Sequence, residues 1–125
     1  MPPLMILVAG PYRSGTGDDP VKLAANVQAM NETALALFRA GHLGVTGEAL
    51  ALPLLETAGS AGPDDPLFAE LFHPVAERLL ERCDGVLRIG GPSAGADRMV
   101  AHARAHGKAV WTAVEEIPPA VGGDC

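Results

Sequence analysis

The 125-residue chain has little of what nucleic-acid-binding and disulfide-stabilised proteins need. Its nine lysines and arginines are outnumbered by fifteen acidic residues, which gives a net charge of −6. This composition excludes the dense basic surface that grips a nucleic acid polymer or an anionic membrane. The two cysteines, Cys83 and Cys125, have no metal-binding or disulfide spacing, and we expect Cys83 to be a small buried hydrophobe. Any anionic ligand must therefore be small and locally bound.

Long hydrophobic runs are also lacking. The apolar run at residues 4–9 is too short to span a membrane, and it has neither the basic start nor the cleavage site of a signal peptide. We therefore expect a soluble, cytoplasmic protein without a membrane partner. The length indicates a single domain at 1–117, followed by a short C-terminal tail at 118–125.

What the chain does contain is an alternation of strand-like and helix-like segments. The run 4–9 has no polar alternation, which is typical of a central strand covered on both faces. Apolar residues at three- and four-residue steps predict helices over 20–40, 65–83 and 96–106, the first two beginning at an Asp-Pro pair. Further strands are predicted at 42–46, 85–89 and 109–112.

Two segments are less regular. Residues 47–55 fit either a loop or a helical turn, and residues 58–65 are small and polar enough for a mobile surface loop. The remaining order, β-α-β-α-β-α-β, predicts an α/β fold with an open parallel sheet of four or five strands flanked by helices. Ligands of such sheets bind at the carboxyl ends of the strands. The loops at 10–17 and 90–95 both qualify.

The first loop, "GPYRSGTG", matches neither common nucleotide motif. No Lys-Ser or Lys-Thr pair follows its glycines, and their spacing differs from the dinucleotide fingerprint. It does offer Tyr12, whose ring can stack on a flat heterocycle, and Arg13, which can bind a carboxylate or phosphate. The alternative is a simple turn in which Tyr12 caps the core and Arg13 is solvated.

The second loop ends with Ser93 and Gly95 just before a predicted helix, where unpaired N–H groups and the helix dipole favour an anion. Ser93 can equally be a helix cap. Asp97 in the first turn would repel a phosphate, whereas Arg98 would attract one. Two loops facing one another favour a small-molecule site more than either loop alone.

Other polar residues are weaker candidates. Glu48 follows the second strand and is the best-placed carboxylate after Asp97. His102 and His106 lie four residues apart and could bind a metal on one helix face, but this spacing is more often a solvated pair, so we expect no metal site and no cofactor. The remaining charges of the predicted helix 65–83 read as its solvated face, namely Glu77, Arg78, Glu81 and Arg82.

Several segments together resemble a known family. They are "ILVAGPYRSG" near the start, Asn26, "AGHLGVT", and "CDGVLRIGGPSAGADRMVAHARAHGKAV". The chain resembles the nucleoside 2-deoxyribosyltransferase-like superfamily, which includes the 2'-deoxynucleoside 5'-phosphate N-hydrolases. The resemblance implies a flavodoxin-like (Rossmann-like) sheet, a homodimer or higher homo-oligomer, and a pocket for a nucleoside or nucleotide. The resemblance places the loop from Gly10 to Arg13 near the base and sugar, and the loop from Ser93 to Gly95 near the sugar or 5'-phosphate. Together with the properties of the two loops, this gives the expected ligand-binding residues, namely Gly10, Pro11, Tyr12, Arg13, Ser93, Gly95, Ala96 and Arg98.

At the positions that match the catalytic residues of that family, this chain has other residue types. Active members use a glutamate nucleophile that attacks the sugar's anomeric carbon. The matching position here is Met99, and the position of the assisting aspartate is Ala76. If the protein performs glycosidic chemistry, Asp97 or Glu48 is expected to carry it.

Three hypotheses follow. The first is a nucleoside- or nucleotide-binding protein with lost or altered glycosidic chemistry. The second is an active N-glycosidase or deoxyribosyltransferase that uses a relocated carboxylate. The third is a non-catalytic assembly module in which the two loops are merely turns.

Overall fold

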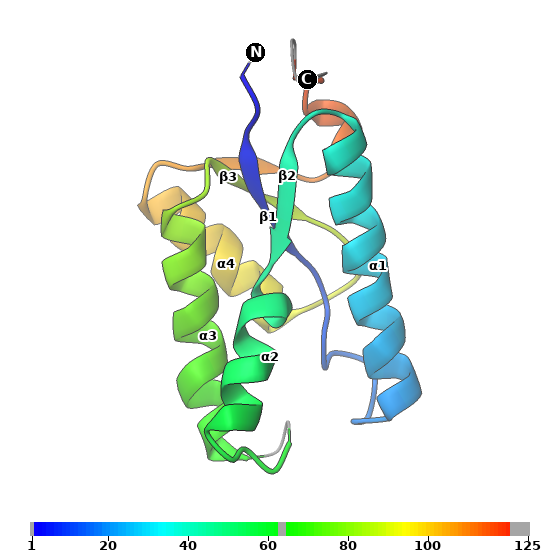
Figure 1. Cartoon of the computed structure of the whole chain (residues 1–125), viewed down its shortest axis with the longest axis vertical. Helices are drawn as coiled ribbons and strands as arrows, with labels where there is room; N and C mark the ends of the chain where they lie inside the picture. The colour runs from blue at the N-terminus through cyan, green and yellow to red at the C-terminus, as the bar shows by residue number, and fades with distance from the viewer. Residues whose placement is uncertain (1, 63–64, 121–125) are drawn as a thin grey trace.

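The computed structural model describes residues 2–62 and 65–120, and it contains one four-stranded parallel sheet (Figure 1). The strands are β1 (Met5–Ala9), β2 (Leu43–Thr46), β3 (Gly85–Arg88) and β4 (Ala109–Trp111), in the order β2-β1-β3-β4. Every pairing is parallel. The predicted α/β class, the open parallel sheet and the interior position of the first strand are confirmed, and the arrangement is consistent with a flavodoxin-like sheet.

Strand β1 is covered on both faces. Ile6 and Val8 pack in one cluster with Met30 and Leu37 of helix α1 (Pro20–Arg39). The alternate residues of β1 point to the opposite face, where they pack against helices α3 (Pro66–Glu81) and α4 (Ala94–Ala105). Figure 1 shows α1 on one side of the sheet and the α3–α4 pair on the other. Cys83 lies in this second cluster and is buried, as expected.

Residues 47–55, for which the sequence fitted either a loop or a helical turn, belong to helix α2 (Gly47–Thr57). The expected element order is corrected accordingly, because two helices, not one, connect β2 to β3. The Thr46 hydroxyl accepts a hydrogen bond from the backbone N–H of Ala49 and caps the helix. Pro53 lies inside α2 and breaks the sequence signal for a helix. Packing of α2 against α3 compensates for this, and the main contacts are made by Ala51, Leu55, Phe68 and Phe72.

Three helices begin where the sequence places a cap. The side chains of Asp19, Asp65 and Ser93 each accept a hydrogen bond from a backbone N–H in the first turn. The predicted surface loop at 58–65 follows α2, and its residues 63–64 lie outside the described residues. A 3-10 turn at Val114–Glu116 was not predicted. Within the described residues, no helix is both long and apolar enough to cross a membrane.

His42 joins the two ends of the described chain. Its Nδ1 accepts a hydrogen bond from the Leu4 backbone N–H at 3.0 Å, and its Nε2 donates to the Pro118 carbonyl at 2.8 Å. The Ala120 N–H also donates to the Ala40 carbonyl at 2.8 Å. The first part of the expected tail at 118–125 is therefore bonded to the domain, whereas residues 121–125 lie outside the described residues.

Gly44 of β2 provides a test of how closely α1 packs on the sheet. A Cβ at this position would lie 2.7 Å from the Cα of Ala34, so Gly44→Ala forces the helix away from the strand. We expect the free energy of unfolding to fall by about 1–3 kcal/mol, measured by urea denaturation. Gly91→Ala is the matched control because its added methyl group would meet no atom within 4 Å. Equal stability of the two variants would contradict this packing.

Candidate functional site

A cavity of about 180 Å³ lies at the carboxyl edge of the sheet. This is many times the volume that one water molecule needs, so the cavity can hold a small organic molecule. Its walls come from the end of β1, the loops after β1 and β3, the start of α2 and the first half of α3. A helix that crosses between parallel strands begins at their carboxyl edge, and the first turns of α3 therefore reach this site. The loops at 10–17 and 90–95 do meet at one cavity, as predicted.

One wall is aromatic. The rings of Phe68 and Phe72 are stacked at a centroid distance of 5.0 Å, and the Tyr12 ring lies nearly parallel to both at 6.0 Å. All three line the cavity. Sequence reasoning identified Tyr12 but read Phe68 and Phe72 as core residues of a helix. Their place in the first two turns of a crossover helix was the signal that could have located them at the site.

The loop that carries Tyr12 is held by side chains. The Asn26 amide donates to the Tyr12 carbonyl at 2.8 Å, and the Thr16 hydroxyl donates to the Arg13 carbonyl at 2.6 Å. Arg13 lines the cavity with its guanidinium 5.9 Å from the centre of the Phe68 ring. Its Nε also bonds to Asp18 at 3.2 Å. Arg13, the expected anion-binding residue, thus lines the cavity, but a bound anion would share its guanidinium with the carboxylate of Asp18.

Glu48 is the ionisable residue most affected by its surroundings. It stands in the first turn of α2, lines the cavity and is only 6% exposed. Burial raises the pKa of its carboxyl from 4.5 to about 7, with a smaller opposing effect from its own backbone N–H. Nearby, burial raises the pKa of Tyr12, and the charge of Glu48 adds to that shift. Near neutral pH, Glu48 can therefore act either as a proton donor or as an acceptor.

Another part of the cavity wall is formed by the start of α4 and by His73 of α3, whose ring lies edge-on to Phe72 at a centroid distance of 5.7 Å. Ser93 accepts a hydrogen bond from the Ala96 N–H at 3.1 Å, so it is a helix cap that also lines the cavity. A Cβ on Gly95 would lie 3.1 Å from Cε1 of His73, which shows how closely the two residues approach. Burial lowers the pKa of His73, as does the charge of Arg98, and this favours its neutral form.

The two positions at which the family resemblance places carboxylates both face the cavity. Met99 and Ala76 line it, and both belong to the buried cluster beneath β1. Their side chains make that wall apolar. Among the described residues that line the cavity, Glu48 is the only carboxylate.

Several predicted site residues lie elsewhere. The Asp97 side chain is 70% exposed and pairs with Arg88 at 3.1 Å. Arg98 donates to Glu77 from Nε at 3.0 Å and from Nη2 at 3.1 Å. Neither lines the cavity. Of the predicted binding residues, those that do line it are Gly10, Tyr12, Arg13, Ser93, Gly95 and Ala96.

Pro11 is not among the lining residues but packs close to the second loop, since a Cβ on Gly90 would lie 2.7 Å from its Cδ.

Comparison with models of known protein families finds no match, and comparison with curated proteins finds none either.

The raised pKa of Glu48 predicts a specific pH dependence of stability. Between pH 4.5 and about 7 the unfolded chain loses the Glu48 proton while the folded protein keeps it, so the free energy of unfolding falls as the pH rises. Relative to Glu48→Gln, the wild type should lose about 2–3 kcal/mol between pH 5 and pH 8, measured by chemical denaturation. Glu56→Gln, an exposed change on the same helix, should leave the wild-type profile intact. Parallel profiles for wild type and Glu48→Gln would contradict the assignment.

Proposed function

We propose that the protein binds a nucleoside or a nucleoside 5'-monophosphate in the cavity at the carboxyl edge of the sheet. The observation that carries this proposal is that three near-parallel rings, those of Tyr12, Phe68 and Phe72, line the same cavity as one buried carboxyl group, that of Glu48. A planar base gains stacking energy against such rings. Glu48, with a pKa of about 7, can donate a hydrogen bond to a ring nitrogen or accept one from an amino group.

The sugar and phosphate would lie toward α4. The first N–H groups of a helix have no partner within the helix, and the positive end of its dipole favours an anion. Gly95 and Ala96 line the cavity at this helix start, where the Ala96 N–H already donates to the Ser93 hydroxyl, so an anion would rely on the helix dipole and the remaining N–H groups of the first turn. The resemblance of this loop to the deoxyribosyltransferase-like superfamily supports the same orientation of ligand.

The cavity favours binding with lost or altered glycosidic chemistry. Retaining glycosidases use two carboxyl groups about 5–5.5 Å apart, one as nucleophile and one as acid and base. Among the described lining residues only Glu48 carries a carboxyl group, and Met99 can form no glycosyl ester.

One observation supports the second candidate, an N-glycosidase. A buried carboxyl group with a pKa of about 7 suits a general acid that protonates the departing base. In this mechanism water attacks the anomeric carbon, the glycosidic C–N bond breaks, and Glu48 delivers its proton to the base nitrogen. The attacking water then loses a proton to solvent and leaves a hydroxyl group on the sugar, and Glu48 takes up a proton from solvent before the next turnover.

Binding is tested by calorimetric titration with a panel of ribo- and deoxynucleosides and their 5'-monophosphates. We expect at least one of them to bind, and Tyr12→Ala to weaken its affinity about 10-fold through loss of stacking. The matched control is Phe38→Ala, because Phe38 is 67% exposed on α1. Silence across the panel, or equal effects of the two substitutions, would contradict the proposal.

Catalysis is tested separately by chromatography of free base after incubation with the same panel. The binding proposal predicts no base release above the uncatalysed rate. Release that is abolished in Glu48→Gln but retained in Asp97→Asn would instead establish the N-glycosidase.

A further inference from the structure

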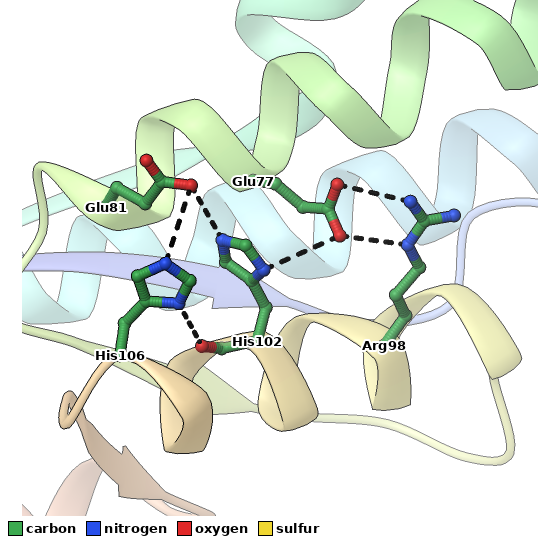
Figure 2. A network of polar contacts seen from close by, with 5 residues as sticks. All are labelled: Glu77, Glu81, Arg98, His102 and His106. Atoms are coloured by element: carbon green, nitrogen blue, oxygen red, sulfur yellow. Dashed lines mark hydrogen bonds and ion pairs between the residues drawn. The ribbon is translucent and has the colours of Figure 1, made fainter.

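A second group of polar side chains lies at the other end of the α3–α4 pair (Figure 2). Glu81 is the last residue of α3, and His102 and His106 lie one turn apart at the end of α4. Oε2 of Glu81 is 2.9 Å from Nε2 of His102 and 3.9 Å from Nε2 of His106. The ligand atoms of the three residues all lie within 4.8 Å of one another.

His102 is placed between two carboxylates. Its Nε2 faces Glu81, while its Nδ1 is 3.7 Å from Oε2 of Glu77 (Figure 2). A neutral imidazole has one N–H and can satisfy only one of two such acceptors. A metal ion bound to Nε2 and Glu81 would leave the single N–H of His102 on Nδ1, where it faces Glu77.

The surrounding hydrogen bonds orient both histidine rings for binding a metal ion. Nδ1–H of His106 donates to the His102 carbonyl at 2.9 Å, which leaves Nε2 of His106 as the free ligand atom. Glu77 accepts two hydrogen bonds from Arg98, and this pairing lowers the pKa of its carboxyl. Carboxylates and carbonyls that hold the second nitrogen of a ligating histidine are a regular feature of metal sites.

We propose that Glu81, His102 and His106 bind a divalent transition metal, with zinc as the ion that best fits two imidazoles and one carboxylate. Tetrahedral zinc at 2.0–2.1 Å from each ligand separates the ligand atoms by about 3.3 Å. The observed separations of 2.9 and 3.9 Å lie on either side of that value. The side chains of Glu81 and His106 are 43% and 44% exposed, so they are free to make the small rotations required.

The bound ion would join the end of α3 to the end of α4. It needs three protein ligands and leaves a fourth position for water. The cavity is lined by residues nearer the starts of these helices, including His73 and Met99. The metal would therefore cross-link the two helices α3 and α4, and its binding would not depend on the ligand proposed for the cavity.

The direct test is calorimetric titration of the chelator-treated, tag-free full chain with zinc at pH 7.5. We expect one ion per chain, and a loss of affinity greater than about 10-fold in both Glu81→Gln and His106→Ala. Glu77→Gln should weaken binding about 10-fold, because it removes the carboxylate that orients His102. Arg104→Ala is the matched control, since Arg104 is an exposed residue of the same helix outside the cluster.

A second measurement locates the ion. The zinc X-ray absorption spectrum of the wild type should show two imidazole ligands, and zinc should raise the thermal midpoint of the wild type but not of His106→Ala. Absence of zinc binding would overturn the proposal. Equal affinity in wild type and His106→Ala, or sulfur ligands in the spectrum, would place the metal elsewhere and overturn it as well.

Discussion

Burial of β1 on both faces is the constraint on which the rest of the structure depends. Residues 6–9 are at most 5% exposed, so apolar helices must cover both sides of the sheet. Helix α1 covers one side, and the α3–α4 pair covers the other. Because neighbouring strands are parallel, every connection returns across the sheet, and the loops after β1, β2 and β3 emerge at one edge. The cavity follows directly from this arrangement, since those loops and the start of α3 enclose it.

The cavity couples core packing to chemistry. Met99 and Ala76 belong at once to the buried cluster beneath β1 and to the cavity wall, so the apolar core extends to the site. A carboxyl group enclosed by such walls loses solvation, which is why the pKa of Glu48 is raised. These two apolar positions are the ones at which the resemblance to the deoxyribosyltransferase-like superfamily would place carboxylates. A thioether cannot form a glycosyl ester, so Met99 cannot serve as the nucleophile of a covalent glycosidic mechanism.

Helices α3 and α4 carry polar side chains that face one another along the pair. Both helices return across the sheet in the same direction, so they are parallel, and a residue of α3 meets the residue about 21 positions later. Residues four apart share a helix face, so Glu77 and Glu81 on α3 lie opposite Arg98 and His102 on α4, with His106 one turn further along (Figure 2). The α3 row continues to His73, which lines the cavity, whereas the α4 row begins at Arg98. Arg98 belongs to this row, which explains why it does not reach the cavity.

Local patterns in the sequence determined the strands, the capped starts of α1 and α3, the burial of Cys83 and the two loops that meet at the cavity. These follow from periodicity, caps and glycines, which act over a few residues. Only the tertiary structure decided that 47–57 is a helix, because packing against α3 outweighs Pro53. It also decided which side chains enter the cavity: Glu48 does, whereas Asp97 turns to Arg88. Helical spacing shows which residues share a face, but the neighbour that each face meets depends on contacts between segments far apart in the chain.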